Sequence, residues 1–428
     1  MNGESLQSIL VFELAAIEPR STATLTKRYR TSIPILYLIL IIAVLFSAVV
    51  ASDASAAETV AKSQESGVRD FVEYWSASRL LLNGDNPYSP EELLKLQQSV
   101  GWPNATALVM WNPPWTFSFT LPFAVPSFSL AQFAWLLVQL LIVLICTQLL
   151  ASFYGTSSAT CRLEWGVALS FVPTVFVLVI GQISPLVLAG ITGFLVLESK
   201  GRSVAAGAAL AIVSIKPHLL YLFWFALLLW VCREGRWRVL LGFAIGFLLV
   251  ALVPLYFDPH VYRHYLELYS REEILQPFDF ATPTLRNIFP LLIGRSDGWL
   301  QSLPSVFGIA WLVCYWERHK GQWRWSEELP LVLLVSVTTS FFAWTYDYVV
   351  ILPALIEVAA WIKRTPLPWY RSWAVLSYLT INAVHAVMRF WHAEEFSYVW
   401  VAPALMLSYI VYRHEKQTKT AARLAVLA

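Results

Sequence analysis

The chain of 428 residues is 57% hydrophobic and only 14% charged, with a formal net charge of +2. Soluble domains carry roughly a quarter charged residues, so this composition excludes a soluble globular protein and predicts an all-α polytopic membrane protein. The small net charge argues against nucleic-acid binding, and the four cysteines lack the spacing of a zinc site or a disulfide framework.

A polar lead with several basic residues precedes the first long apolar run. We expect residues 1–32 to form a cytoplasmic segment and residues 33–52 to form the first span. The run is longer than the core of a signal peptide. We therefore expect an uncleaved anchor, although the small residues at 51–58 imitate a cleavage site.

Apolar windows of about 17 to 25 residues predict about twelve spans, several of them short, in a single domain over 33–412. The stretch 113–126 is apolar but has proline at both ends and inside. Because proline-broken backbone survives at membrane depth only when protein or water covers it, we interpret this stretch as re-entrant or interfacial. The later windows lie near 129–153, 164–180, 184–199, 203–216, 217–232, 238–257, 299–317, 329–344, 348–362, 372–391 and 397–412.

The basic residues orient this layout. If 113–126 does not span, the positive-inside rule holds in every short loop downstream, and both termini are cytoplasmic, including the tail 413–428. Two large loops, 53–128 and 258–298, then lie outside. Five polar stretches meet on that outer face, as in a site built from loops on a rigid scaffold: 70–88, 181–184, 215–219, 282–289 and 344–348.

The stretch from Val68 to Tyr88 predicts an amphipathic helix in the membrane plane, ended by Gly84 and a turn. Asp70 either complements the dipole of the first helical turn or acts as a general base with a pKa raised by its apolar surroundings. Glu73 has Arg69 four residues before it as a possible partner. The expected apolar stripe is Val68, Phe71, Val72, Trp75 and Leu82, with Asp70, Glu73, Ser76 and Asn83 away from it.

Several motifs in order carry a family resemblance. Asp-Phe at 70–71, an aromatic residue four positions after the aspartate, a leucine-rich turn, Gly and Asn-Pro-Tyr resemble the first outer loop of the family 87 glycosyltransferases. "WNPPW" and "LPFAVPSFSLAQFAW", then "GQISPLVLAG" and "AAGAALAIVSIKPHLL", resemble later family segments in the same order. These relatives are polyprenol-phosphate-mannose-dependent mannosyltransferases of the GT-C class.

The resemblance implies a GT-C-type fold and an inverting transfer of a sugar, mannose by inheritance from the family, to a lipid or glycan hydroxyl. Asp70 matches the family's catalytic base. The late segment "AWTYDYVVILP" matches only loosely, because Tyr346 and Tyr348 stand where histidine is expected, and Asp347 is the candidate for a related role. The implied partners are a polyprenyl-phosphate sugar donor, an acceptor and membrane lipids, with no cofactor.

A departing lipid phosphate requires cations. Lys216 is the first candidate, because a lysine in apolar sequence is costly without an anionic partner, although it alternatively snorkels to the interface. Arg286 is a second candidate and alternatively an interfacial anchor, with His218 beside the phosphate and Arg389 weaker. No Asp-x-Asp motif stands in the outer loops, so we predict a metal-independent reaction.

Polar and aromatic residues near these motifs are candidate contacts for the sugar or the acceptor: Glu73, Tyr74, Tyr88, Trp111, Asn112, Gln182, Tyr346 and Asp347. Gln182 alternatively forms a hydrogen bond between helices. A transporter or flippase of lipid-linked sugars is the main alternative function, and a polymerase or ligase of lipid-linked glycans is another. We expect a multi-pass protein of the bacterial plasma (inner) membrane with its site on the extracytoplasmic side.

Overall fold

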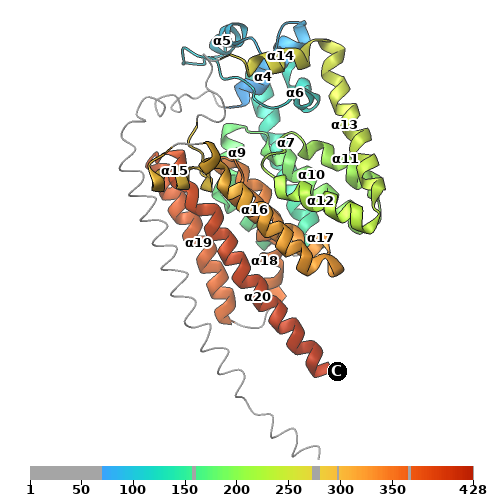
Figure 1. The fold of residues 1–428 in the computed structure, drawn as a ribbon. Coiled ribbons are helices and arrows are strands. Elements are labelled where there is room, and N and C mark those ends of the chain that lie inside the picture. The colour runs from blue at the N-terminus through green and yellow to red at the C-terminus, as the bar shows by residue number, and fades with distance from the viewer. Residues whose placement is uncertain (1–69, 157–160, 272–279, 296–297, 365–367, 428) are drawn as a thin grey trace, which may run out of the picture. The chain divides into compact units, whose positions relative to one another are not determined.

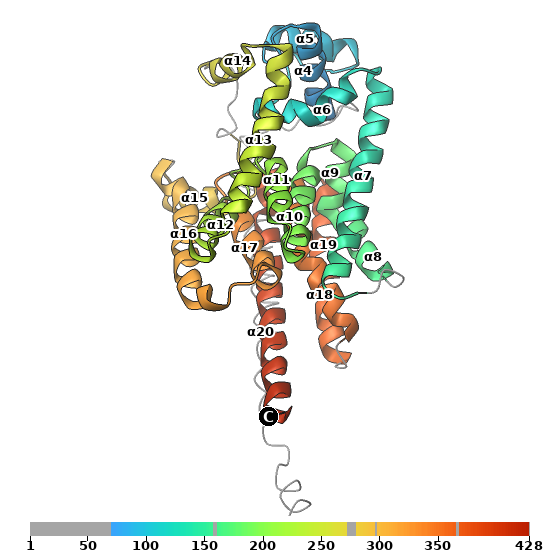
Figure 2. The same ribbon diagram turned by 90° about the vertical axis from the view of Figure 1, so that its right-hand side faces the viewer.

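Helices make up every element of the computed structural model, which describes residues 70–156, 161–271, 280–295, 298–364 and 368–427 (Figures 1 and 2). Both the predicted cytoplasmic lead, 1–32, and the first predicted span, 33–52, lie outside these residues. Each later predicted window contains a helix. They are α7 (Phe128–Phe153), α10 (Ser184–Ser199), α11 (Ser203–Val213), α12 (Tyr221–Glu234), α13 (Trp237–Phe257), α16 (Gly298–His319), α17 (Trp325–Thr339), α18 (Leu352–Arg364), α19 (Pro368–Phe390) and α20 (Val401–Leu427), besides a broken pair described below.

A helix that crosses a membrane alone must be both long enough and apolar enough, which is a stricter requirement than lying in an apolar window of the sequence. Three described stretches meet it, namely α7, α13 and the continuous run Thr345–Arg364, and a bent helix pair makes a fourth if it counts as one span. Helices α10 and α11 are apolar but shorter. The protein is therefore an all-helical membrane protein, and several predicted windows are helices too short or too polar to qualify as spans singly.

The sequence analysis predicted one span over 164–180. The structure shows a broken helix there instead. It consists of α8 (Arg162–Ser170) and α9 (Val172–Ile180), which meet at an angle of 62°. Phe171 adopts an extended conformation between them, and Pro173 in the next turn has no N–H to donate to the preceding turn. The Asn382 side chain accepts the Val172 N–H at 2.8 Å, so the break leaves this amide satisfied.

The first large loop folds into short helices that pack on one another and on α14 (Val261–Leu268). They are α4 (Phe71–Asn83), α5 (Pro90–Ser99), η2 (Pro114–Thr116) and α6 (Phe117–Ala124), which lie together in both views (Figures 1 and 2). The stretch 113–126 thus forms η2 and α6. At about 1.5 Å per residue, α6 is too short to cross a membrane alone.

The polar face predicted for α4 is wrong at Glu73 and Ser76, whereas Asn83 is exposed as predicted. Glu73 and Ser76 are buried, because side chains of neighbouring segments supply polar partners. The Ser76 hydroxyl accepts from Gln97 Nε2 of α5 at 3.0 Å, and Ser78 bonds Thr120 of α6 at 2.7 Å. Buried hydroxyl groups of this kind are stable when they are hydrogen-bonded. Helix α4 is therefore enclosed on nearly all sides rather than half-exposed.

Close helix packing fixes the middle of the protein. A Cβ atom on Gly207 of α11 would lie 1.9 Å from the Val239 carbonyl oxygen of α13, and one on Gly242 would lie 2.0 Å from the Val204 carbonyl oxygen. Small residues let the two backbones approach in this way, as is common where membrane helices pack. Helix α11 leads directly to the connection that carries Lys216.

We predict that Gly207→Ala destabilises the protein by about 1–3 kcal/mol, because the added methyl group forces α11 and α13 apart. Gly166→Ala is the matched control, since its Cβ meets nothing within 4 Å. Thermal unfolding of the purified protein in detergent measures both. Equal melting temperatures for the two variants would contradict the packing argument.

Candidate active site

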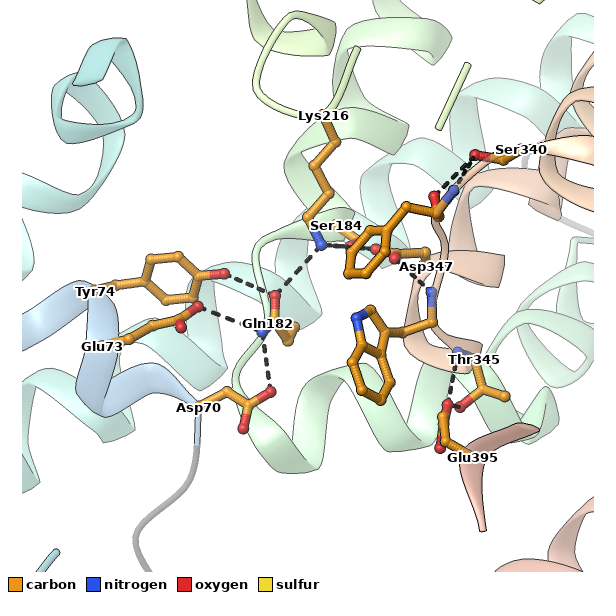
Figure 3. A network of polar contacts seen from close by, with 12 residues as sticks. Asp70, Glu73, Tyr74, Gln182, Ser184, Lys216, Ser340, Thr345, Asp347 and Glu395 are labelled. Carbon is orange, nitrogen blue, oxygen red and sulfur yellow. Dashed lines mark hydrogen bonds and ion pairs between the residues drawn. The ribbon is translucent and has the colours of Figure 1, made fainter. Parts of the chain in front are cut away.

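Side chains from five separate segments form one polar network (Figure 3). They come from the start of α4, the turn between α9 and α10, the connection between α11 and α12, η7 (Thr345–Ile351) and η8 (Glu395–Trp400). The first four correspond to polar stretches that the sequence analysis expected to meet. The fifth was not among them.

Asp70 occupies the N-cap position of α4, but its side chain makes no capping hydrogen bond to the helix that it precedes. Its Oδ2 instead accepts a hydrogen bond from Gln182 Nε2 at 2.9 Å. Burial raises the pKa of Asp70, and the charge of Glu395 adds to that effect. The Gln182 hydrogen bond and the positive charge of Lys216 act in the opposite direction. Asp70 as a whole residue is half-buried.

Glu73 stands one helical turn after Asp70 and shares its partner. Gln182 Nε2 lies 3.4 Å from Glu73 Oε1. Burial, followed by the negative charge of Asp70, raises the pKa of Glu73 to about 8, so this carboxyl group is mostly protonated at neutral pH. The partner expected for it, Arg69, lies outside the described residues.

The turn that carries Gln182 requires glycine. Gly181 ends α9 with φ 79°, and a Cβ there would lie 2.7 Å from the Phe71 Cβ of α4. Trp135 Nε1 of α7 donates to the Gly181 carbonyl oxygen at 2.7 Å. The turn is thereby fixed against α4 and α7, and it places Gln182 beside the two carboxyl groups. The Tyr74 hydroxyl completes the contact by donating to Gln182 Oε1 at 2.7 Å.

Lys216 and Asp347 form a buried ion pair on the other side of Gln182. The distance from Lys216 Nζ to Asp347 Oδ1 is 2.7 Å, and the two side chains are 8% and 1% exposed. Ser184 donates to the same oxygen at 2.5 Å, and the Trp344 N–H donates to Oδ2 at 2.9 Å. The Tyr346 ring lies 4.9 Å from the ammonium group. Lys216 is therefore held inside the protein by an anion and does not snorkel to the surface.

A second ionic group adjoins the network, and sequence reasoning missed most of it. Glu395 Oε1 accepts the N–H and the hydroxyl of Thr345, at 2.9 and 2.5 Å, and Glu395 Oε2 accepts Arg389 Nη1 at 2.9 Å. The Arg389 guanidinium lies between the rings of Phe176 and Tyr398. One sequence signal could have found this group. Glu395 follows Arg389 at the end of an apolar stretch, where a charged side chain is costly unless a charge of opposite sign pairs with it.

Other predicted site residues lie elsewhere in the fold. Tyr88 is buried against Phe117 and Tyr265, and the Trp111 ring packs on Tyr269, so both belong to the contact with α14 and the segment after it. Asn112 is half-buried beside Trp111.

The two further cation candidates have their own surroundings. Arg286 is buried, with Nε and Nη2 donating to Gln301 Oε1 at 2.9 and 2.6 Å and the Phe341 ring 4.2 Å away. His218 has an exposed side chain with its ring against Phe342. Lys216, in contrast, bonds both Gln182 and Asp347, at 3.4 and 2.7 Å.

The described residues combine an all-helical membrane scaffold with a buried network of carboxyl groups and a lysine. The family model described as glycosyltransferase family 87 matches residues 111–346, more than half of the chain. The chain belongs to this family and is an enzyme that transfers a sugar. Searches of curated proteins and of solved structures gave no significant match. The matched range includes Gln182, Ser184 and Lys216 and excludes Asp70 and Glu395.

We predict that Lys216→Met and Asp347→Asn each destabilise the protein by about 3–5 kcal/mol, because either change leaves one buried charge without its partner. The double variant should cost less than the sum, since it removes both charges. Thermal unfolding in detergent measures the cycle. Glu317→Gln, which breaks a largely exposed pair with Lys320, is the control and should cost less than about 1 kcal/mol. Additive costs for the buried pair would contradict the prediction.

We also predict a pH effect from Glu73. Its folded-state pKa of about 8 exceeds the ordinary value of 4.5, so the folded protein holds this proton more tightly than the unfolded chain. Stability should therefore fall as the pH rises from the ordinary value through about 8. Between about pH 6 and pH 9, the melting temperature of Glu73→Gln should fall less than that of wild type. The exposed Glu92→Gln should follow wild type, and parallel curves for all three proteins would refute the assignment.

Proposed function

We propose that this enzyme transfers a sugar, mannose in the first instance, from a polyprenyl-phosphate donor to a hydroxyl group of a lipid or glycan acceptor. Transfer takes place on the extracytoplasmic side with inversion at the anomeric carbon. The observation that carries the proposal is the network in which Gln182 joins a half-buried carboxyl group, Asp70, to a buried cation, Lys216. A base at one end and a cation at the other suit a displacement that begins with an alcohol and ends with a phosphate.

Asp70 is the better base of the two neighbouring carboxyl groups. Glu73 is 7% exposed, and its pKa of about 8 keeps it mostly protonated at neutral pH. Asp70 is more exposed, and it receives the shorter Gln182 hydrogen bond, at 2.9 Å. In the proposed step, Asp70 takes the proton from the acceptor hydroxyl. The acceptor oxygen then forms the new bond to the anomeric carbon, and the bond from that carbon to the phosphate oxygen breaks.

Lys216 is the proposed contact for the departing phosphate. Its ammonium group donates to Asp347 at 2.7 Å, to Ser184 at 3.1 Å and to Gln182 at 3.4 Å. The third contact is the longest, so a phosphate oxygen replaces it at the lowest cost. Asp347 holds the lysine in place, and this is the role that we assign to it in the segment where the family resemblance is loose. Tyr346 covers the ammonium group from one side.

The acceptor and the carrier lipid require further surface. Trp111 and Asn112 are partly exposed, and we keep them as proposed contacts for the acceptor. Tyr88 is 1% exposed, which leaves its ring no open face for a ligand. Arg286 and His218 remain proposed phosphate-side residues. Arg286 would have to leave Gln301 to reach a phosphate, whereas His218 is exposed. We assign no cofactor or divalent metal to the reaction.

We predict that Asp70→Asn lowers the transfer rate by about 10²–10⁴-fold, because the amide cannot accept the acceptor proton. The assay uses purified protein in nanodiscs, radiolabelled polyprenyl-phosphate mannose, a panel of lipid acceptors and EDTA. Asp85→Asn, an exposed aspartate of the same loop, is the matched control and should keep the wild-type rate.

Four results would each overturn one part of the proposal. An Asp70→Asn rate close to that of wild type would remove the base assignment. Loss of wild-type transfer in EDTA that added Mg²⁺ or Mn²⁺ restores would remove metal independence. No transfer by wild type from any polyprenyl-phosphate sugar would remove the donor class. Product with the donor's own anomeric configuration, seen by NMR, would exclude inversion.

A further inference from the structure

We infer that Gln182 is a positioning residue: it fixes the Asp70 carboxylate for proton transfer and links it to the Lys216 ammonium group. This inference rests on the proposed function, because it assigns Asp70 as the base. It replaces the direct sugar contact that the sequence analysis expected for Gln182. The side-chain amide of Gln182 makes four contacts, with Tyr74, Asp70, Glu73 and Lys216 (Figure 3).

The chemistry of the neighbours fixes the orientation of this amide. A lysine ammonium group only donates hydrogen bonds, so the Gln182 oxygen must face Lys216. The nitrogen then faces the carboxyl oxygens of Asp70 and Glu73, at 2.9 and 3.4 Å. The Tyr74 hydroxyl donates to the amide oxygen at 2.7 Å and reinforces the same orientation. The flipped amide would place its nitrogen against the Lys216 ammonium group.

These contacts use the full capacity of the amide. A glutamine side chain offers two N–H donors and two acceptor positions. Here the donors meet Asp70 and Glu73, and the acceptor meets Tyr74 and Lys216. Gln182 is also 5% exposed. A sugar hydroxyl bound to the amide nitrogen would have to displace Asp70 or Glu73, so positioning accounts for that side of the amide better than direct sugar binding.

The backbone beneath the amide is held equally firmly. The Gln182 N–H donates to the Val177 carbonyl oxygen at 3.2 Å, which closes the end of α9. Ser184, two residues later, is bonded to Asp347. The turn is therefore attached to α4 by the amide and to η7 by the serine, and a shift of Gln182 would disturb both.

The physical consequence concerns the ionised form of Asp70. An N–H donor stabilises a carboxylate more than a neutral carboxyl group, so the Gln182 bond lowers the pKa of Asp70 against the effect of burial. The other groups acting on Asp70 are Lys216, which favours ionisation, and Glu395, which opposes it. Glu73, Tyr74 and Tyr346 also face this charge. Without Gln182, Asp70 should remain protonated to a higher pH.

The test is the pH profile of kcat for Gln182→Leu in the transfer assay described above. We expect the acidic limb to move to higher pH, with a loss of roughly tenfold at pH 6 that shrinks to under about threefold at pH 9. The KM for the donor should stay within about twofold of wild type. Gln139→Leu is the matched control, because it removes another buried glutamine, from α7, and should leave the profile unchanged.

Tyr74→Phe is the second variant, and it decides the matter if Gln182→Leu fails to fold. It removes one hydroxyl that orients the amide and should move the acidic limb in the same direction by a smaller amount. A loss that is equal at every pH, or a raised donor KM with an unmoved limb, would overturn the inference. If Asp70→Asn itself retains activity, the base assignment within the proposed function has failed. If Asp70→Asn is inactive while the limb stays in place, only the inference has failed.

Discussion

The buried ion pair between Lys216 and Asp347 is the interaction on which the site depends. Its partners lie 131 residues apart in the chain, and removing both charges from water carries a large cost. The protein offsets that cost with a short contact of 2.7 Å and with donors from Ser184 and the Trp344 backbone. These bonds require the α9–α10 turn, the α11–α12 connection and η7 to meet in one place. The packing of α10 and α11 with their neighbours brings those segments together.

An amide between the cation and the carboxyl groups has a chemical advantage over direct contact. If Lys216 were paired with Asp70, the lysine would hold that carboxylate strongly in its ionised form and weaken it as a proton acceptor. Gln182 keeps the two apart and still orients both. Glu73, which keeps its proton at neutral pH, adds little charge beside Asp70. In the proposed function, the site thus separates a proton-accepting end from a phosphate-binding end within one continuous network.

The segments that complete the site lie partly outside the family match. The match covers residues 111–346, whereas Asp70 precedes it and Asp347 and Glu395 follow it. Glu395 reaches the network through Thr345, which belongs to the same short helix as Asp347. The early loop and the late helices therefore supply acidic groups, and the matched middle supplies the lysine and the amide between them.

The sequence by itself determined the helical membrane class, because long apolar windows such as 129–153 and 238–257 satisfy their backbone hydrogen bonds in lipid only as helices. It also indicated that the short polar stretches with Gln182 and Lys216 meet on one face of the membrane, and that Lys216 needs an anionic partner, because a charged side chain in apolar sequence is costly without one. It did not determine the partner of Lys216, the burial of Glu73 or the break before Pro173. The tertiary structure decided these, because each depends on which distant segment packs against the residue: η7 against Lys216, α5 and α6 around α4, and Asn382 at the freed Val172 amide.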